Sequence, residues 1–330
     1  MPHRSLKKSD RYVFAGGGTG GHLYPGIALS NELKGESLFL CTERPFDRRA
    51  LEAAGKSFEA LSSPRLGFTF PFRFGRACRQ AAQILKKVGP RVVIGLGGYG
   101  TVPTAVAAFF QGIPFVLMEQ NIIPGKANRF LARLARRVYV QWAGTKMRGS
   151  LLATGSPLRA SLRKIPREEA CRKFGLDPHR PVVLVLGGSQ GAAALNQVEI
   201  PAQTLRITGK GKSASGDVVI EYLDDMEFAY SAADLAISRA GAMAIAELAF
   251  FGLPTILIPY PHAAHDHQRA NARALGEAVC IVEEAEMDLL GDRVSKLVSG
   301  GEALHNMSRD FQRFASPDAA KLIMEDLAKI

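Results

Sequence analysis

The sequence has few cysteines and no long apolar run, and each shortage excludes a class of protein. Its four cysteines lie far apart, without paired spacing, at Cys41, Cys78, Cys171 and Cys280. Neither a disulfide framework nor a cysteine metal site is therefore indicated. No apolar run approaches the roughly 18 residues of a membrane-spanning helix. The apolar stretch 12–15 that follows the basic start is too short for the core of a signal peptide. We therefore expect a cytoplasmic protein.

The composition is that of a soluble protein with two domains. The chain has 330 residues, of which 47% are hydrophobic and 22% are charged. This length exceeds what one ordinary hydrophobic core accommodates. The formal charge of +11 predicts attraction to an anionic partner. Nucleic acid, acidic lipid and a phosphorylated substrate all fit this charge.

A strand, a glycine loop and a helix are predicted near the start of the chain. Residues 11–15 are typical of a buried strand, residues 16–22 (Gly-Gly-Gly-Thr-Gly-Gly-His) form the loop, and residues from about 25 to 33 are helical in pattern. Glycines permit close backbone approach, and a helix N-terminus offers unpaired N–H groups, so this arrangement predicts an anion site. No Gly-Lys-Ser/Thr follows, which excludes the nucleoside-triphosphate loop.

The same loop also fits a dinucleotide-binding motif. Gly16, Gly18 and Gly21 satisfy the pattern G-x-G-x-x-G, and Glu43 follows the next predicted strand, where such folds place an acid on the ribose. An NAD- or flavin-dependent oxidoreductase is therefore an alternative function. His22, at the end of the loop, is a candidate general base because the helix dipole disfavours its charged form. The alternative role for His22 is a structural cap.

Phenylalanines and arginines interleave in residues 65–87, whose second part has helical spacing. We expect the phenylalanines to lie in a loop-like approach to this helix, beside the arginines; the residues concerned are Phe68, Phe70, Phe72, Arg73 and Arg76. Aromatic side chains exposed among arginines suit a membrane interface. The alternative is a loop packed on its own domain.

Two other polar stretches have plain explanations. A helix predicted over residues 126–137 would carry Arg129, Arg133 and Arg136 on one face, and a solvated face is favoured over contact with nucleic acid. A later loop carries His262, His265 and His267. Their spacing matches no His-x-x-x-His ligand pair, so a polar substrate loop is favoured over zinc.

Two further glycine loops follow predicted strands. They are Gly97-Gly98-Tyr99 and residues 187–191 (Gly-Gly-Ser-Gln-Gly). A third such loop is hard to explain in a single dinucleotide domain but is natural in two Rossmann-like domains. A turn cluster at 154–159 predicts the boundary. We therefore expect domains at residues 1–155 and 156–330, with a last helix that packs back on the first domain.

One acidic side chain lies within an apolar helix. A strand ends near Ile237, and Gly241 permits a turn of the backbone after it. The helix that follows, from Ala242 to Phe251, is apolar except for Glu247. A buried carboxylate without donors costs several kcal/mol, so Glu247 needs a partner. A ribose offers two hydroxyl donors, which predicts a nucleotide site beside this helix. The alternative is a carboxylate on a solvated edge of the helix.

Taken together, these motifs resemble family 28 of the GT-B glycosyltransferases, which acts in peptidoglycan synthesis. The resemblance runs from about residue 12 to residue 273 and is most specific in the glycine loops at 17–22 and 187–191. Other matching segments are 97–99, 119–121, 155–159, 224–226, the region of Glu247 and 266–268. The fold it implies is α/β: two Rossmann-like domains that face each other across a cleft.

The resemblance also implies a reaction. N-acetylglucosamine would pass from UDP-N-acetylglucosamine to the C4 hydroxyl of lipid I, which is MurNAc-(pentapeptide)-pyrophosphoryl-undecaprenol, giving lipid II with inversion at the anomeric carbon. No cofactor or metal is implied, and Asp-x-Asp does not occur in the chain. Backbone N–H groups, a helix dipole and Arg159 would stabilise the leaving diphosphate. The implied partners are the two substrates and an anionic membrane surface, not nucleic acid, and the implied location is peripheral, on the cytoplasmic face of the inner membrane.

The family pattern carries over to named residues. His22 is the first candidate for the catalytic base, and Glu119 is the second. The residues expected to bind the donor are Thr19, Gly20, Gly21, Asn128, Arg159, Ser189, Leu223, Ala242, Met243, Ala244, Glu247 and Gln268. The acceptor pyrophosphate is expected at Gly17, Gly18, Gly97, Gly98 and Tyr99, and the membrane contact at Phe68, Phe70, Phe72, Arg73 and Arg76.

The chain departs from the family pattern at three places. Met118 stands where many relatives have histidine, and Ala244 stands where a hydroxyl residue is common. Residues 196–222 are short for a full α/β unit, by a helix and more. This shortened segment lies in the expected donor domain.

Overall fold

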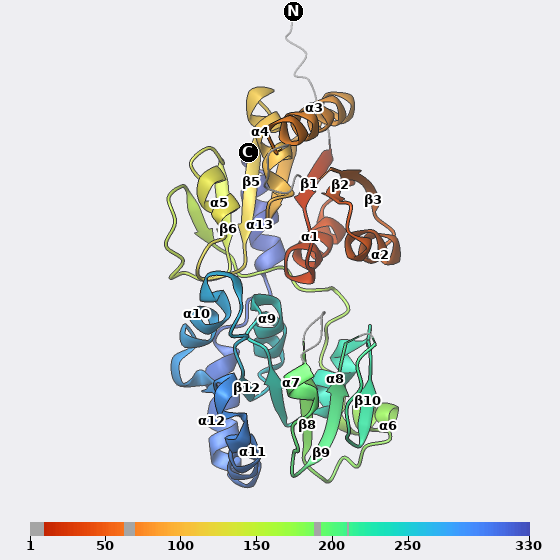
Figure 1. Ribbon diagram of the computed structural model, residues 1–330, viewed down its shortest axis with the longest axis vertical. Helices are drawn as coiled ribbons and strands as arrows, with labels where there is room; N and C mark the ends of the chain where they lie inside the picture. Colours follow the sequence, from red (N-terminus) through yellow and green to blue (C-terminus); the bar gives the residue numbers. More distant parts are fainter. Residues whose placement is uncertain (1–9, 63–69, 188–192, 210) are drawn as a thin grey trace, which may run out of the picture. The chain divides into compact units, whose positions relative to one another are not determined.

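The chain forms two α/β units (Figure 1) in a computed structural model that describes residues 10–62, 70–187, 193–209 and 211–330. Unit 1 comprises Met1–Arg159 and Asp318–Ile330, and unit 2 comprises Ala160–Pro317. The division falls after Arg159, whereas the sequence placed it after residue 155. The last residues of the chain belong to unit 1.

Unit 1 is built on a seven-stranded parallel sheet with the strand order β3-β2-β1-β4-β5-β6-β7. Its strands are β1 (Arg11–Gly16), β2 (Glu36–Thr42), β3 (Ser57–Leu61), β4 (Val92–Gly97), β5 (Phe115–Glu119), β6 (Arg137–Val140) and β7 (Leu151–Ala153). Every residue of β4 and β5 is buried. Such continuous burial is typical of parallel strands with helices on both faces.

Helices cover both faces of this sheet. In the described part of unit 1 they are α1 (Gly20–Glu32), α2 (Pro45–Ala53), α3 (Phe70–Val88), α4 (Thr101–Phe110), α5 (Lys126–Leu131) and α13 (Ala319–Leu327). One core contains Leu23 of α1, Leu51 of α2 and Ile323 of α13. The other contains Leu85 of α3 and Leu131 of α5. The sheet therefore lies between two helical layers, each with its own core.

The last helix is fixed to unit 1 by an ion pair as well as by apolar packing. The carboxylate of Asp326 accepts hydrogen bonds from Arg137 Nε at 2.8 Å and from the Tyr139 hydroxyl at 3.1 Å. Burial raises the pKa of Asp326, but the bonds from Arg137 and Tyr139 lower it by more, so it lies below its usual value. Helix α13 thus belongs to unit 1 although it comes last in the chain.

Two helices begin earlier than predicted. Helix α1 begins at Gly20 and not near Pro25, so Gly20, Gly21 and His22 lie in its first turn. Helix α3 begins at Phe70, so the loop predicted around Phe72 is wrong. In α3, Pro71 lies in the first turn, where its missing N–H would have no helical partner.

One predicted helix is much shorter than expected. Helix α5 ends at Leu131, so the helix predicted over 126–137 is wrong. Arg133 lies in the following turn, and Arg136 directly precedes β6. The residues Val138 and Tyr139 pair with β5 on one side and β7 on the other. Because β-branched and aromatic side chains suit a buried sheet, this pairing outweighs the helical spacing of the arginines.

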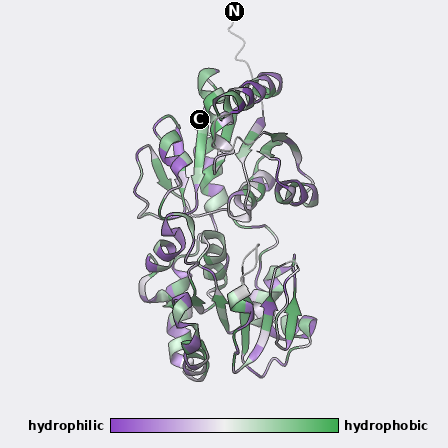
Figure 2. Ribbon diagram, in the orientation of Figure 1, coloured by the Kyte–Doolittle hydropathy of each residue, from purple (hydrophilic) through white to green (hydrophobic). Residues whose placement is uncertain are grey.

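Unit 2 is built on a six-stranded parallel sheet with the order β10-β9-β8-β11-β12-β13. Its strands are β8 (Val182–Leu186), β9 (Gln203–Ile207), β10 (Val218–Ile220), β11 (Leu235–Ser238), β12 (Thr255–Leu257) and β13 (Cys280–Ile281). Its helices are α6 (Arg167–Phe174), α7 (Ala193–Asn196), α8 (Met226–Ala232), α9 (Ala242–Phe251), α10 (His267–Arg273), α11 (Leu290–Ser299) and α12 (Gly301–Gln312), with short 3-10 helices η1 (Ala264–Asp266), η2 (Gly276–Ala278) and η3 (Glu284–Leu289). In Figure 2 hydrophobic residues gather in the strands of both sheets.

The expected helix does not occur between β9 and β10 in the part of the chain that the structure describes. The two strands are parallel neighbours, and the described residues between them, 208–209 and 211–217, contain no helix. Such crossovers usually take a dozen or more residues and contain a helix. The buried guanidinium of Arg206 donates to the carbonyls of Leu195 at 3.1 Å and Val198 at 2.6 Å. These bonds hold the end of α7 and the segment after it against β9.

Each sheet has a point where the strand order reverses. It lies between β1 and β4 in unit 1 and between β8 and β11 in unit 2. Open α/β sheets bind ligands at the carboxyl ends of the strands at such switch points. In unit 1 both strands end in glycine, and Gly16 pairs with Gly97. In unit 2, β11 ends at Ser238, shortly before α9. The glycine loops after β1 and β4, and the turn between β11 and α9, therefore lie at the two switch points.

Candidate functional site

The glycine loop between β1 and α1 has a conformation that only glycine adopts easily. Gly16, Gly17 and Gly18 have φ values of 125°, 146° and 90°, a region that side chains disfavour. A Cβ added to Gly17 would lie 2.5 Å from Oδ2 of Asp47. Any substitution there would therefore displace the carboxylate of Asp47.

Asp47 is a residue that the sequence reasoning missed. Its fully buried carboxylate accepts the Gly18 N–H at 2.7 Å and 2.9 Å, the Thr42 hydroxyl at 2.6 Å and the Thr42 N–H at 3.1 Å. Arg44 Nη1 in turn donates to the Gly18 carbonyl at 2.9 Å. The glycine loop is thus held in place by Asp47 of α2 and by Arg44, which precedes this helix. Because the Gly18 amide already has an anionic acceptor, a bound anion would rely on other donors.

His22 lies against the second glycine loop. A Cβ added to Gly97 would be 3.0 Å from His22 Cδ2, and one added to Gly98 would be 3.7 Å from His22 Cε1. The Nδ1 atom of His22 is 3.1 Å from the hydroxyl oxygen of Thr19. A base at Nε2 requires the tautomer in which Nδ1–H donates to Thr19. The glycines leave room for the ring, and Thr19 can select its tautomer.

Glu119 organises the loop that follows β5. Its buried carboxylate accepts hydrogen bonds from the N–H groups of Asn121 and Gly125 and from Asn128 Nδ2, each at 3.0 Å. Burial raises the pKa of Glu119, and these bonds offset only part of that rise. With both oxygens engaged by its own loop, Glu119 is placed to position this segment, and its role as a base stays a prediction.

Two buried amide side chains beside Glu119 have polar atoms without a protein partner. Over the residues that the structure describes, Asn128 Oδ1 and both amide atoms of Gln120 are buried and make no hydrogen bond. Leaving such a group unsatisfied costs about 1–3 kcal/mol, which indicates a bound ligand or water. Gln120 belongs to the segment 119–121 that matched the family pattern at the end of a buried strand, but no role had been predicted for it.

His22, Gly97 and Asn128, three of the predicted residues of unit 1, lie close together at its switch point. A Cβ on Gly97 would lie within 3.5 Å of both His22 Nε2 and Asn128 Nδ2. The buried hydroxyl of Thr101 donates to the Ala15 carbonyl at 2.9 Å and accepts the Gly97 N–H at 3.1 Å. This hydroxyl ties the ends of β1 and β4 together. Tyr99, by contrast, is mostly exposed at the rim.

In unit 2 the carboxylate of Glu247 has a partner on a neighbouring helix. The hydroxyl of Tyr230 on α8 donates to Glu247 Oε2 at 2.6 Å, and the Tyr230 ring packs against Phe251 at 5.0 Å between ring centres. Glu247 itself is half-buried on α9. Ala242, Met243 and Ala244 form the first turn of this helix, at the end where the helix dipole favours an anion. The carboxylate and the anion-binding end of α9 thus lie on one helix.

The loop before α10 contains two residues in a rare backbone conformation. His265 and Asp266 both have φ of 55°, and such strain often marks functional loops. Asp266 accepts from Arg269 at 2.9 Å, and Arg269 also pairs with Glu283 at 2.8 Å. The amide oxygen of Gln268 accepts the Tyr260 N–H at 2.9 Å. No group of three His, Cys, Asp or Glu suited to a metal occurs among the described residues.

The remaining predicted donor contacts are less informative. Leu223 is half-buried in the segment before α8. The guanidinium carbon of Arg159 lies 6.0 Å from the centre of the Tyr24 ring, at the limit of a cation–π contact. Ser189 lies outside the described residues, so its expected role stays a prediction.

The predicted membrane contact falls on α3, except for Phe68, which lies outside the described residues. The side chain of Phe72 is 84% exposed, and Arg73 and Arg76 are exposed beside it. The end of α4 presents Phe109 and Phe110, exposed by 48% and 81%; these two were missed. Gln111, which follows them, donates to the Ala82 carbonyl of α3 at 2.8 Å. None of the described helices is both long and apolar enough to cross a bilayer.

Two models of known domain families match the chain. Residues 12–140 match the glycosyltransferase family 28 N-terminal domain, and residues 182–323 match the C-terminal domain of the same family. Among solved structures, that of Acinetobacter baumannii MurG is similar over 97% of this chain and 99% of that chain, with a TM-score of 0.78 and 26% sequence identity. A UDP-GlcNAc 2-epimerase from Neisseria meningitidis, at 15% identity and a TM-score of 0.67 over 97% and 99% of the two chains, shares the fold.

Two relatives that align with nearly all of the chain share one name. The UDP-N-acetylglucosamine–N-acetylmuramyl-(pentapeptide) pyrophosphoryl-undecaprenol N-acetylglucosamine transferase of Phocaeicola vulgatus is 33% identical, over 98% of this chain and 97% of the relative. The transferase of the same name from Halothermothrix orenii is 34% identical, over 97% and 99%. Since the two family models match most of the chain and these relatives align with nearly all of it, the chain belongs to glycosyltransferase family 28.

Proposed function

We propose that this protein transfers N-acetylglucosamine from UDP-N-acetylglucosamine to the C4 hydroxyl of the N-acetylmuramyl sugar of lipid I, forming lipid II. The observation that carries this proposal is the similarity to transferases named for this reaction, at 33–34% identity over nearly all of both chains. The convergence of His22, the Gly97–Gly98 loop and Asn128 at the switch point of unit 1 supports it, as does the Glu247 arrangement in unit 2.

The donor would bind mainly to unit 2. Glu247, oriented by Tyr230, would accept hydrogen bonds from the ribose hydroxyls. The N–H groups in the first turn of α9, at Ala242, Met243 and Ala244, would face the diphosphate, because a helix N-terminus favours anions. The other expected donor contacts would complete the site: Thr19, Gly20, Gly21, Asn128, Arg159, Ser189, Leu223 and Gln268.

The chemistry would be a single displacement with inversion. The acceptor hydroxyl attacks the anomeric carbon, the bond from that carbon to the diphosphate oxygen breaks, and UDP leaves. His22 Nε2 would take the hydroxyl proton, with Nδ1–H held by Thr19. The end of α9 and Arg159 would stabilise the charge that develops on the diphosphate.

The lipid-linked acceptor would bring the enzyme to a membrane surface. Phe72 is exposed on α3 beside Arg73 and Arg76, and Phe109 and Phe110 are exposed at the end of α4, where Gln111 bonds to α3. Aromatic side chains beside cations suit the interface of an anionic bilayer. The protein would therefore bind peripherally to the cytoplasmic face of the inner membrane, where lipid I is made available, and not to nucleic acid.

The alternative, an NAD-dependent oxidoreductase, has less support. Such an enzyme would place the dinucleotide pyrophosphate on the amides of the loop at Gly16 to Gly21, but the Gly18 amide is bound to Asp47. Calorimetric titration of the protein with UDP-N-acetylglucosamine, UDP-glucose and NAD in turn separates the two functions. We expect binding of UDP-N-acetylglucosamine, weaker binding of UDP-glucose and no binding of NAD. Binding of NAD alone would reverse the assignment.

A further inference from the structure

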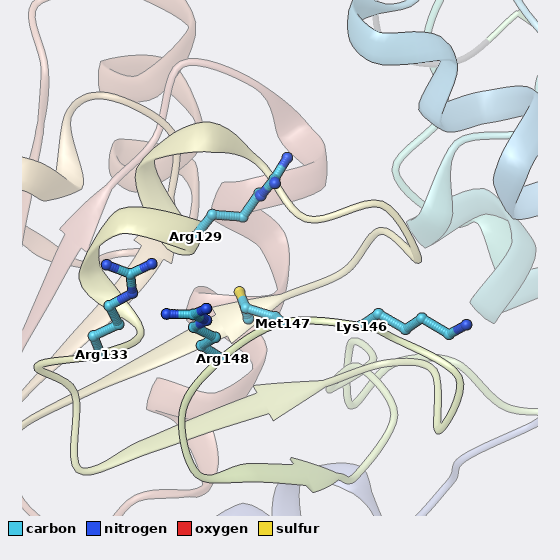
Figure 3. A pocket seen from close by; sticks show the side chains of 5 residues that line it. All are labelled: Arg129, Arg133, Lys146, Met147 and Arg148. Atoms are coloured by element: carbon cyan, nitrogen blue, oxygen red, sulfur yellow. The ribbon is translucent and has the colours of Figure 1, made fainter.

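Unit 1 has a basic pocket whose lining includes no residue assigned to the transferase site. The pocket has a volume of about 300 Å³ and is lined by Arg129, Arg133, Lys146, Met147 and Arg148 (Figure 3). Arg129 lies on α5 and Arg133 in the turn after it, while the other three belong to the loop between β6 and β7. The pocket thus unites two segments of chain that β6 separates.

The positive charge of this pocket is not neutralised by the protein. Throughout the described ranges, none of its four cationic side chains makes an ion pair or a side-chain hydrogen bond. Residues 120–150 contain seven lysines and arginines and no aspartate or glutamate. Of these seven, Arg137 is paired with Asp326. Like charges held together without a counter-charge favour an anionic ligand.

The two backbone segments that carry the lining residues of the pocket are held together by the fold. Met147 packs against the core of unit 1. Gly149 has φ of 115°, and a Cβ added to it would lie 2.5 Å from the carbonyl oxygen of Ala132. The loop therefore touches the turn after α5 closely, which keeps Arg148 beside Arg133. In Figure 3 the guanidinium of Arg148 points toward Arg133.

We propose that this pocket binds a phosphate or diphosphate group that carries at least two negative charges. Guanidinium groups match phosphate oxygens with paired hydrogen bonds, and the pocket offers three of them. A single carboxylate would offset one charge of four. The exposed side chains of Phe130 and Leu134 flank the arginines of this segment. The same group can therefore come from a lipid headgroup or from a soluble phosphate compound.

The test uses the whole chain and two matched double variants. Pyrophosphate is titrated calorimetrically in the presence of saturating UDP, which occupies the nucleotide site. The pocket variant carries Arg133→Ala and Arg148→Ala. The control carries Arg293→Ala and Lys296→Ala on α11, which removes the same charge from an exposed helix of unit 2. A third protein, with Arg133→Lys and Arg148→Lys, keeps the positive charge but loses the planar guanidinium groups and their paired N–H donors.

A second arm identifies the source of the phosphate. Vesicles of phosphatidylcholine, with or without phosphatidic acid, are co-sedimented with the same proteins. The expected result is a loss of at least tenfold in the affinity for pyrophosphate or for phosphatidic acid vesicles in the pocket variant. The control would bind like the parent, and the lysine variant would fall between them.

If the pocket variant loses affinity only for pyrophosphate, the ligand is a soluble phosphate compound. If it loses affinity only for vesicles, the ligand is a lipid headgroup. The proposal is overturned if the pocket variant binds pyrophosphate and vesicles as tightly as the parent does, or if the control variant loses as much affinity as the pocket variant. Far-ultraviolet circular dichroism verifies that each variant is folded, as expected for exposed side chains. The outcome is independent of whether the protein is a transferase, because no substrate is transferred in either arm.

Discussion

The hydroxyl of Tyr230 donates a hydrogen bond to Oε2 of Glu247 at 2.6 Å. The two residues lie on adjacent helices, α8 and α9, and the Tyr230 ring is buried against Phe251. The bond therefore fixes the direction of the carboxylate on which the proposed ribose site depends. Tyr230 would thus be a positioning residue for the proposed donor site.

Removal of this hydroxyl tests the positioning role. We expect Tyr230→Phe to weaken UDP binding about three- to tenfold, since one hydrogen bond contributes about 0.5–1.5 kcal/mol, while the ring keeps its packing. Glu247→Ala would weaken binding by at least tenfold because the carboxylate itself is lost. Calorimetric titration with UDP measures both. If both folded variants bind UDP like the parent, Glu247 does not contact the nucleotide.

His22 and Thr19 form a second pair whose roles can be separated. His22→Ala would lower turnover by about 10²–10⁴-fold, as is typical for loss of a general base, with little change in UDP affinity. Thr19→Val removes the partner of His22 Nδ1, so the tautomer that carries its proton on Nε2 becomes populated. We expect turnover to fall, but by less than in His22→Ala.

The pH dependence of kcat distinguishes these roles from a merely structural effect. The parent would lose rate at acid pH as the imidazole becomes protonated, and His22→Ala would lack this loss. A His22→Ala protein with near-normal turnover across neutral pH would exclude the residue as the base, and Glu119 would then be tested.

The proposed membrane face predicts a change in vesicle binding. A variant with Phe72→Ser, Phe109→Ser and Phe110→Ser would sediment with anionic vesicles at least about tenfold more weakly, because each inserted ring contributes on the order of 1.5–3 kcal/mol. The matched control is Val219→Ser with Leu289→Ser, two exposed apolar residues of unit 2. Equal sedimentation of the triple variant and the parent would place the docking face elsewhere.

The Asp326 ion pair predicts a pH-dependent stability of unit 1. The pKa of Asp326 is lower in the folded protein than in the unfolded chain, so the pair stabilises the fold above the unfolded value of about 3.9. This contribution is lost as the pH falls through the lower, folded value. We expect Asp326→Asn to reduce the free energy of unfolding by about 1.5–3 kcal/mol at pH 7.

The difference between parent and variant would shrink as the pH falls below about 4. Urea unfolding can be followed by the fluorescence of Trp142, the single tryptophan, which lies in unit 1. A difference that stays constant down to pH 2 would mean that the substitution acts through packing and not through charge.

Several parts of the fold could be predicted because they follow from short-range chemistry. Helix α9 begins after Gly241 and ends where Gly252 adopts φ of 63°, as its composition indicated. The glycine loops after β1 and β4 follow buried apolar runs, and parallel order places them together. The described residues between β9 and β10 contain no helix, which the small number of residues in this segment had indicated.

Other parts depend on contacts between residues far apart in the sequence. The bond from Gly18 to Asp47 joins positions 29 residues apart, and no local pattern marks an aspartate for that role. The partner of Glu247 is 17 residues away, on another helix. The end of α5 was misjudged because the pairing of β6 with two strands decides it.

The environment of an aromatic pair was equally hard to predict. Residues 108–114 resemble residues 249–254 in sequence, each ahead of a strand. Yet Phe110 is 81% exposed, whereas Phe251 is 9% exposed because Tyr230 packs against it. Similar segments in the two units therefore differ in burial through what the rest of each unit brings to them.

The most direct test of the central claim is transfer itself. The protein is incubated with radiolabelled UDP-N-acetylglucosamine and a soluble lipid I analogue, with UDP-glucose as the matched donor control. We predict a labelled disaccharide on an intact pyrophosphoryl lipid, with a β linkage, one UDP released for each sugar transferred and little product from UDP-glucose. A protein that binds UDP-N-acetylglucosamine but yields no labelled lipid, or retains the α configuration, would contradict the account.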